Sequence, residues 1–283
     1  MTRLAELQDR VASLTELEQI VAALRSLASM RVQEAVKALD GIRQYAATIA
    51  TAIADALQLT PEGSATTRAP ARSVRLVIVF LSESGFVGGL NERLLDAACE
   101  DLGASDVLCP LGSRGAALAE ERGLRIGWRL PLPTRLASVP DTVRHILAEL
   151  YRAISAGEVR EARMIFARYR RSAAPTIERR TLFPIDLKRP VGTRAQLPPL
   201  HNLAPAELLE KLIAEYVFAR LTRAATDALA SENAARFAAM EAAHDNVAKR
   251  LEELQQQARQ ARQEEITAEL LDIVTGAASI TRQ

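Results

Sequence analysis

Hydrophobic residues recur with a heptad period along the first sixty positions of the chain. Counted from Leu4, fourteen of sixteen seam positions are apolar, and Glu18 and Arg25 are the exceptions. A repeat of about 3.5 residues sustained over this length is typical of a left-handed coiled coil. Gly41 weakens such a helix by about 1 kcal/mol without ending it. The seam consists of Leu4, Leu7, Val11, Leu14, Glu18, Val21, Arg25, Ala28, Val32, Ala35, Leu39, Ile42, Ala46, Ile49, Ile53 and Ala56.

The last part of the chain predicts a second long helix. No proline follows Pro205, and Gly276 is the only glycine after it, so residues 205–280 can stay helical throughout. At about 1.5 Å per residue this helix would be about 110 Å long, several times the width of a small domain. We expect it to pair antiparallel with the N-terminal helix. Its seam residues are Leu251, Leu254, Ala258, Ala261 and, after a five-residue step that should disturb the supercoil, Ile266, Leu270, Ile273 and Ala277.

The middle of the chain predicts an α/β domain. Residues 74–81 form an apolar, β-branched run, and shorter runs at 106–109, 161–169 and 176–187 read as further strands, the last one antiparallel. Helices are predicted at 91–102, at about 113–122 and at 141–156. Strands that alternate with helices indicate a mostly parallel, Rossmann-like sheet. Residues 60–73 read as a linker, which gives domains at 1–59, 74–200 and 205–280.

Composition excludes several classes of protein. With 36 basic and 35 acidic residues the formal net charge is +1, which gives no electrostatic preference for nucleic acid. No apolar run is long enough to cross a membrane, and the N-terminus lacks the apolar core of a signal peptide. We interpret the two cysteines, Cys99 and Cys109, as reduced, buried thiols.

Two glycine-rich segments follow predicted strands. The first contains Gly85, Gly88, Gly89 and Asn91, but it does not match the G-x-G-x-x-G pattern of dinucleotide-binding turns. The second, Gly112-Ser113-Arg114-Gly115, could present amides and a guanidinium to an anion. In the first segment, a tight turn and close helix–sheet packing explain the glycines better than a ligand does. In the second, a helix start with an exposed arginine is the better explanation.

Other catalytic or metal-binding patterns are missing from the sequence. The three histidines, His145, His201 and His244, have no cysteine or carboxylate at metal-ligand spacing. The sequence also contains no nucleophile elbow, Walker A loop or H-E-x-x-H motif. We expect no catalytic residue, metal or cofactor.

Four segments, in order along the chain, resemble the gamma subunit of F-type ATP synthases. Ser84 to Asn91 is similar to that family's D-R-G-L-C-G-G-L-N, and Gly112 to Gly115 is similar to its G-S-K-G. The blocks 231–240 and 262–277 are similar to S-E-x-A-A-R-M-x-A-M and R-Q-x-x-I-T-x-E-L-x-E-I-V-x-G-A. The helix around 20–35 keeps the register of the N-terminal signature.

The resemblance implies a non-catalytic central rotor shaft with a long antiparallel coiled coil and a central Rossmann-like α/β domain. Its partners would be the alpha and beta subunits of the catalytic head, the epsilon subunit and the membrane c-ring, without nucleic acid and without insertion into the membrane. Its location would be the cytoplasmic face of the inner (plasma) membrane, as a peripheral part of the complex. Residues implied to contact the beta subunit are Arg236, Arg262, Gln263, Thr267 and Glu269.

The chain departs from the family pattern at several positions. Glu83-Ser84 stands where the family has Asp-Arg, Val87 replaces its Cys, and Leu24 stands where Met is usual. These departures indicate a divergent or alternative ATPase branch. Two other functions stay open: an enzyme with a small nucleotide-binding domain, and a coiled-coil scaffold that carries a small nucleotide- or anion-binding α/β domain.

Overall fold

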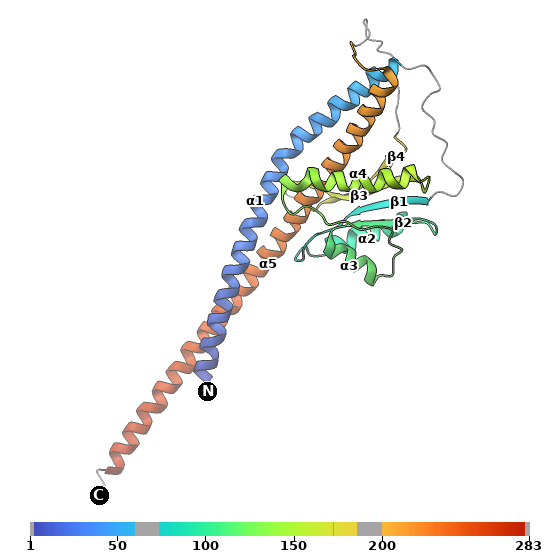
Figure 1. The fold of residues 1–283 in the computed structure, drawn as a ribbon. Helices are drawn as coiled ribbons and strands as arrows, with labels where there is room; N and C mark the ends of the chain where they lie inside the picture. The colour runs from blue at the N-terminus through green and yellow to red at the C-terminus, as the bar shows by residue number, and fades with distance from the viewer. Residues whose placement is uncertain (1–2, 60–73, 172, 186–199, 281–283) are drawn as a thin grey trace. The chain divides into compact units, whose positions relative to one another are not determined.

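Two long helices flank a small α/β region in the order of the chain (Figure 1). The computed structural model describes residues 3–59, 74–171, 173–185 and 200–280. Contacts divide the chain into two compact units, Met1–Leu27 with Phe237–Gln283 and Ala28–Arg236, which we call the terminal unit and the sheet unit. The elements in order are α1 (Arg3–Gln58), β1 (Val74–Phe80), α2 (Leu90–Asp101), β2 (Val107–Leu111), α3 (Ser113–Glu121), the 3-10 helix η1 (Leu136–Ser138), α4 (Val139–Ser155), β3 (Val159–Arg168), β4 (Thr176–Phe183) and α5 (Pro205–Ile280).

Both long helices form where the sequence predicts them. α1 continues through Gly41, and α5 begins at Pro205, whose fixed φ and missing N–H suit the first position of a helix. None of the sixteen predicted seam positions of α1 is exposed, whereas the off-seam residues Leu17 and Ile20 are 46% and 57% exposed. The heptad reading of α1 is therefore confirmed.

Within the terminal unit, α1 and α5 run antiparallel. Arg3 pairs with Glu264 at 3.9 Å and Arg25 pairs with Glu241 at 3.1 Å, so residue numbers fall along α5 as they rise along α1. Between these pairs an apolar cluster is formed by Leu7, Leu254 and Ala261, with Leu4, Val11, Leu14 and Ala258 packed against it.

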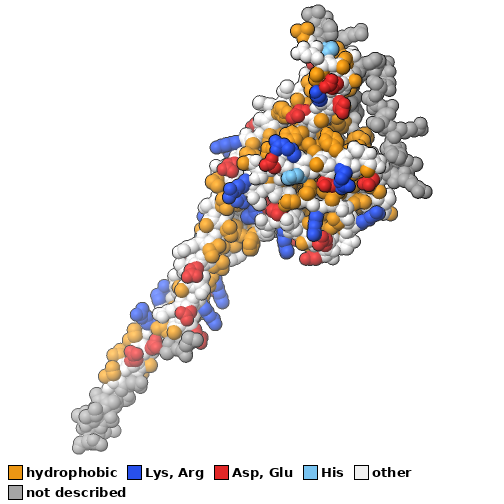
Figure 2. Space-filling view, in the orientation of Figure 1, with side chains coloured by type: hydrophobic (Ala, Val, Ile, Leu, Met, Phe, Trp, Pro, Cys, Tyr) orange, Lys and Arg blue, Asp and Glu red, His pale blue; other side chains and the backbone are white. Residues whose placement is uncertain are grey.

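The seam prediction fails for the end of α5. Ile266, Leu270 and Ile273 are 49%, 58% and 67% exposed. These residues lie beyond Glu264, which pairs with Arg3 at the start of the described part of α1, so no described residue of α1 lies opposite them. Figure 2 shows hydrophobic side chains at the surface of this part of α5.

The sheet unit contains a four-stranded sheet with the order β2-β1-β3-β4. β1 pairs in parallel with β2 and with β3, and β4 closes one edge antiparallel to β3, as the sequence predicts. β4 ends at Phe183 and not at Leu187, directly before Pro184, which cannot donate a backbone hydrogen bond. The predicted linker at 60–73 and the residues 186–199 lie outside the described residues.

Helices cover both faces of this sheet. Ile78, Phe80, Met164 and Phe166 face a core shared with α4 and with the α5 stretch from Val217 to Leu229. Val77, Val79 and Ile165 face a second core formed with α2 and α3. Because β1 is buried on both faces, its sequence is a continuous apolar run instead of an alternating one.

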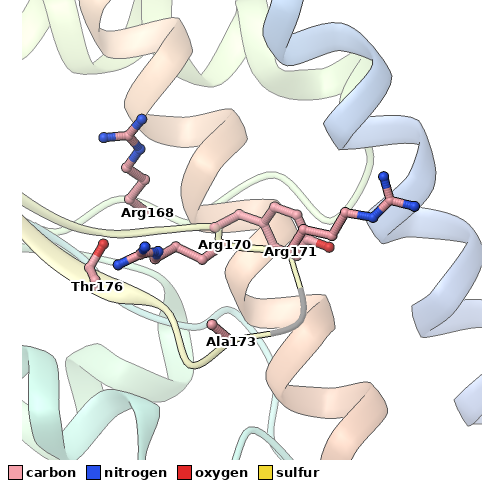
Figure 3. Close-up of a pocket in the computed structure, with 6 residues that line it drawn as sticks. Arg168, Arg170, Arg171, Ala173 and Thr176 are labelled. Atoms are coloured by element: carbon pink, nitrogen blue, oxygen red, sulfur yellow. The ribbon is translucent and has the colours of Figure 1, made fainter.

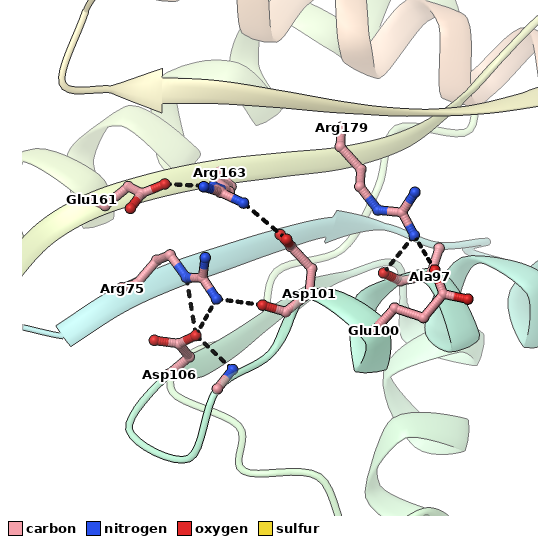
Figure 4. Close-up of polar contacts among 9 residues, drawn as sticks. Arg75, Ala97, Glu100, Asp101, Asp106, Glu161, Arg163 and Arg179 are labelled. Atoms are coloured by element: carbon pink, nitrogen blue, oxygen red, sulfur yellow. Dashed lines mark hydrogen bonds and ion pairs between the residues drawn. The ribbon is translucent and has the colours of Figure 1, made fainter.

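A polar network joins the C-terminal end of α2 to the strands (Figure 4). Arg75 of β1 donates to the Asp106 carboxylate, with Nε 2.9 Å from Oδ2, and to the Asp101 carbonyl. Arg163 of β3 donates to the Asp101 carboxylate at 2.8 Å, and Arg179 of β4 donates to the Ala97 carbonyl at 3.1 Å. Guanidinium groups thus satisfy carbonyls at the negative end of the helix dipole.

We expect Asp106→Asn to lower the free energy of unfolding by about 2 kcal/mol at neutral pH, because a buried carboxylate with charge-assisted bonds is lost. Burial alone would raise the pKa of Asp106, but the Gly103 N–H and the Arg75 guanidinium outweigh it and hold the pKa below its ordinary value. A lowered pKa stabilises the fold above the ordinary value, and this contribution disappears as pH falls through the folded value. On acidification below about pH 5 the variant should therefore lose less stability than wild type, measured by urea unfolding.

Asp96→Asn is the matched control for this experiment. Its carboxylate pairs with Arg122 at 2.7 Å, but the side chain is 65% exposed, so we expect a change below about 0.5 kcal/mol. Equal losses in the two variants would contradict the role assigned to Asp106.

Three further predictions concern the cysteines, the domain limits and membrane-spanning segments. Cys109 is buried, and burial raises its pKa to about 12, but Cys99 is exposed on α2, so the prediction of two buried thiols is wrong for Cys99. The domain limits 1–59, 74–200 and 205–280 stay a prediction, because the compact units divide both long helices internally. Within the described residues, the helices contain no segment long and apolar enough to cross a membrane.

Candidate functional site

The segment that follows β1 is the point where three of the sequence motifs meet. Ser82 lies just after the strand and is fully buried. Its N–H donates to Asn91 Oδ1 at 2.9 Å, and Asn91 Nδ2 donates to Ser82 Oγ at 2.7 Å. Asn91, the last residue of the first glycine motif, therefore closes the loop 82–91 on itself.

The backbone of this loop explains only part of its glycine content. Gly88 has a φ of 55°, in the left-handed region that favours glycine, and Phe86 adopts a φ of 62° with its side chain 69% exposed. Gly85 has no positive φ, and a Cβ added to it would meet nothing within 4 Å. A Cβ added to Gly89 would have Glu92 Oε2 as its nearest atom, at 4.0 Å. At Gly85 the functional atom is the backbone carbonyl, as the contacts of α5 show.

The second glycine motif packs beneath the end of β1. Gly112 has a φ of 100°, and a Cβ at Gly115 would overlap the Leu81 side chain. The Gly115 N–H donates to the Ser82 carbonyl at 3.1 Å. Glycine at these positions lets α3 approach the strand closely. The helix begins at Ser113 and Arg114 is exposed, which agrees with the prediction of a helix start with an exposed arginine.

Glu83 occupies the N-terminus of α3. Its carboxylate accepts hydrogen bonds from the Ser113 N–H at 3.0 Å, the Ser113 hydroxyl at 2.6 Å and the Leu132 N–H at 2.8 Å. A helix N-terminus is where a phosphate would bind. Here the chain's own carboxylate takes that place, and this contact argues against the nucleotide-binding alternative at this loop.

A buried ion pair on α5 holds the first loop from the other side. Arg236 Nη2 donates to Glu232 Oε1 at 2.6 Å, and both Arg236 Nε and Nη2 lie 3.2 Å from the Gly85 carbonyl oxygen. Glu232 also accepts from the N–H groups of Glu83 and Ser84 at 3.4 Å. We call Glu232, Arg236 and the backbone of residues 83–85 the loop clamp.

Neighbouring residues of the same α5 segment fix the helix against the sheet. Ser231 Oγ donates to the Ala167 carbonyl in β3 at 2.8 Å, and Asn233 Oδ1 accepts from Arg236 Nη1 at 3.2 Å. Ser231 and Asn233 are 0% and 1% exposed. The polar residues of the motif that begins at Ser231 thus point into the molecule, where Ser231 joins α5 to β3 and the loop clamp joins it to the segment after β1.

The predicted beta-contact residues divide into two groups. Arg236 is 9% exposed and belongs to the loop clamp in the sheet unit. Arg262, Gln263, Thr267 and Glu269 belong to the terminal unit and are all exposed on α5. The Thr267 hydroxyl donates to the Gln263 backbone carbonyl at 2.7 Å, so it is satisfied within the helix.

Sequence reasoning missed Glu232 and Glu83. The signal for Glu232 was its position four residues before Arg236, the spacing at which a Glu and an Arg meet on a helix. Glu83 could not be found from spacing, because its donors, at residues 113 and 132, come from segments far along the chain. Among the described residues, no group of three or more His, Cys, Asp or Glu is placed to hold a metal ion.

Comparison with known proteins identifies the family. A family model described as ATP synthase matches residues 3–280. The chain is 29% identical over 290 residues to the ATP synthase gamma chains of Actinobacillus pleuropneumoniae serotype 5b (strain L20) and serotype 7 (strain AP76), with 97% of this chain and 98% of each relative covered.

Solved structures share the fold. One chain of the Euglena gracilis mitochondrial ATP synthase rotor in rotational state 1 aligns with a TM-score of 0.64 and 13% identity, covering 93% of this chain and 98% of that chain. A chain of the same organism's OSCP/F1/c-ring assembly aligns with a TM-score of 0.65 and 15% identity, covering 98% and 94%. Because the family model matches residues 3–280, nearly the whole chain, and the two bacterial relatives are gamma chains, this chain belongs to the ATP synthase gamma family.

Proposed function

We propose that this chain is the central shaft of a rotary ATP synthase or ATPase. In this role it couples ion flow through a membrane ring to conformational cycling of three catalytic beta subunits and contributes no catalytic residue of its own. The observation that carries the proposal is the exposed apolar stripe of α5 that follows the Arg3–Glu264 pair. Exposed apolar side chains at helical spacing indicate a surface that a partner covers.

The chemistry of this end suits a bearing inside a ring of subunits. Ile266, Leu270 and Ile273 follow one another at spacings of four and three, which places them on one side of the helix. Polar groups that can make directional bonds, Arg262, Gln263 and Glu269, are exposed on the same stretch. Apolar contact permits sliding, and a few hydrogen bonds that break at each step can transmit torque.

Coupling requires asymmetry. A shaft that contacted three beta subunits equally would shift their nucleotide affinities by the same amount and could not hold them in different states, because each subunit responds only to its own contacts with the shaft. Two helices of unequal length, with different side chains on each face, present a different surface to each beta subunit. We propose the alpha, beta and epsilon subunits and the c-ring as partners, and a peripheral location at the cytoplasmic face of the membrane.

The first test concerns Gln263 and Arg262. We expect the double change to Ala to lower ATP hydrolysis of the assembled complex by about tenfold, as for the loss of one or two charge-assisted hydrogen bonds. Because both side chains are exposed, the helicity of the isolated subunit should not change. The measurement is ATPase turnover of the complex purified after co-expression with alpha and beta subunits, with circular dichroism of the free chain.

Gln256→Ala is the control, since Gln256 is also an exposed polar residue of α5. Its turnover should equal that of wild type. Wild-type turnover in the Arg262/Gln263 variant would defeat the assignment of those contacts, and a chain that fails to assemble with properly folded alpha and beta subunits would defeat the shaft itself.

A further inference from the structure

A groove rich in arginine lies in the sheet unit, away from the loop clamp. Its volume is about 710 Å³, within the range of small-molecule sites. Residues of α1, β3, β4 and α5 form its walls, and we call it the arginine groove. It is lined by Arg43, Ala46, Ala47, Ala50, Met164, Phe166, Glu178, Arg179, Arg180, Thr181, Pro184, Ile185, Tyr216, Arg220 and Arg223.

The lining contains five arginines and a single carboxylate. That carboxylate, Glu178, is already shared by two guanidinium groups, Arg168 at 2.8 Å and Arg180 at 3.0 Å. Arg179 is turned toward α2, where it pairs with Glu100 at 2.6 Å. Arg43 pairs with Asp40, and Arg223 lies within ion-pair distance of Asp227. Among the described residues, the uncompensated positive charge of the groove therefore comes from Arg220.

Arg220 is the least compensated of these three arginines. It is half-buried, and among the described residues it has no carboxylate within ion-pair distance; its guanidinium lies 5.6 Å from the centre of the Tyr216 ring. Burial lowers the pKa of Arg220, and the nearby charges of Arg180 and Arg223 lower it further. Like charges gathered in this way repel one another unless an anion lies between them.

Buried donors without acceptors are the second independent sign. Arg43 Nε and Arg223 Nε are buried, and neither has a hydrogen-bond partner among the described residues. Among the described residues, the ion pair of Arg43 is the one that Nη1 forms with Asp40, whose side chain is exposed on α1. The Asp227 carboxylate forms an ion pair with Arg223, with Oδ2 3.7 Å from Nε, beyond hydrogen-bond distance. Burial raises the pKa of Asp227, although the charges of Arg223 and Arg43 act in the opposite direction. Nearly all buried donors in proteins are satisfied. Asp227 is the anion that the chain itself places near both arginines, but it forms no hydrogen bond with either Nε, so both donors can still bind a further acceptor.

A second basic hollow is a weaker candidate. It has a volume of about 510 Å³ at the turn between β3 and β4 and is lined by Arg168, Tyr169, Arg170, Arg171, Ala173 and Thr176. Figure 3 shows its guanidinium groups pointing in different directions, and Arg168 is already engaged by Glu178. In the arginine groove, by contrast, cations from separate elements line one cavity.

We propose that the arginine groove binds a phosphate-bearing anion, with Arg220 and Arg223 of α5 and Arg43 of α1 as its donors. The planar guanidinium fork matches two phosphate oxygens at once, which favours phosphate over a single carboxylate. Met164, Phe166 and Ile185 give the groove an apolar portion that suits the organic part of a phosphate ester. The same chemistry occurs in soluble phosphates and in lipid headgroups.

The test uses the full-length chain with inorganic tripolyphosphate as the probe, at constant ionic strength. Wild type should show a saturable rise in thermal midpoint, since a ligand that binds only the folded state stabilises it. Arg220→Gln and Arg223→Gln should each weaken the affinity measured by titration calorimetry about tenfold or more. Arg144→Gln, which removes an exposed arginine on α4, should leave it unchanged.

Two further readouts separate binding from folding. Without the probe, Arg220→Gln should be at least as stable as wild type, because repulsion in the groove is relieved. Arg220→Lys keeps the charge and loses the fork, so it should still bind more weakly than wild type. Equal affinity in all variants would show a non-specific polyanion effect and overturn the proposal.

Vesicle flotation distinguishes the source of the phosphate. Vesicles of phosphatidylcholine with phosphatidic acid, compared with phosphatidylcholine alone, should capture wild type but not Arg220→Gln if the ligand is a headgroup. Binding of tripolyphosphate without capture assigns the site to a soluble phosphate. No specific binding in either experiment would overturn the proposal, and neither result depends on assembly with alpha and beta subunits.

Discussion

Arg236→Ala is expected to lower the free energy of unfolding by about 4 kcal/mol, more than any other single change in this chain for which we give a value. The substitution removes the guanidinium that joins Glu232 to the Gly85 carbonyl and leaves the Glu232 carboxylate, 5% exposed, without its cation. A buried charge that loses its partner destabilises a fold far more than the intact pair stabilises it. Urea unfolding of the free chain measures the effect.

A double-mutant cycle isolates the loop clamp. We expect Glu232→Ala together with Arg236→Ala to be less destabilising than the sum of the two single changes, because neither buried charge is then left unpaired. Arg236→Lys should rescue little, since an ammonium cannot reach the Glu232 carboxylate and the Gly85 carbonyl in the same planar geometry. Additive single effects would show that the two residues act separately.

The clamp also has a local readout. Phe86 is exposed in the held loop, so chymotrypsin should cleave there faster in Arg236→Ala than in wild type. An unchanged cleavage rate would mean that the loop is held by Asn91 and Ser82 alone. In the assembled complex, lost ATPase activity of Arg236→Ala can thus arise from loop release as well as from a missing beta contact, whereas Arg262 and Gln263 report on the contact only.

Gly115→Ala is expected to lower the free energy of unfolding by about 3 kcal/mol. The added Cβ would overlap the Leu81 Cβ and lie 2.8 Å from its Cδ1, and Leu81 is 2% exposed, enclosed by the core under α2 and α3. Because neither side chain has space to move, α3 must shift away from the strand. That shift would also stretch the Ser113 bonds to Glu83.

Gly41→Ala is the matched control for this change. Gly41 lies within α1 with nothing inside 4 Å of a new Cβ, so alanine should stabilise the helix by about 1 kcal/mol. Opposite signs for the two glycine-to-alanine changes, measured by urea unfolding, are the expected result. A loss below about 1 kcal/mol at Gly115 would mean that the packing there relaxes easily.

The elements of the fold could be predicted because their signals are local. The heptad seam of α1, the proline-free stretch of α5 and the apolar run of β1 each indicate their structure within one segment. Boundaries were less accurate, as at β4, which ends at Phe183 although the prediction extended to Leu187. Sequence could also name Asn91, Gly112 and Gly115, since glycines and an Asn after strands indicate turns, but it could not say which atoms they meet.

The two long helices, the α/β region between them and the family could all be predicted from the sequence, because each of these signals lies within one continuous segment of the chain. Three other features became known only from the packing of distant segments: Arg236 meets Gly85 and Glu232, Glu83 occupies the start of α3, and the apolar stripe that begins at Ile266 stays exposed. Hydrogen-bond partners and burial depend on which segments meet in space, and no local pattern encodes that meeting. A helical period predicts an apolar face of a helix, but only the tertiary structure decides whether another segment covers that face.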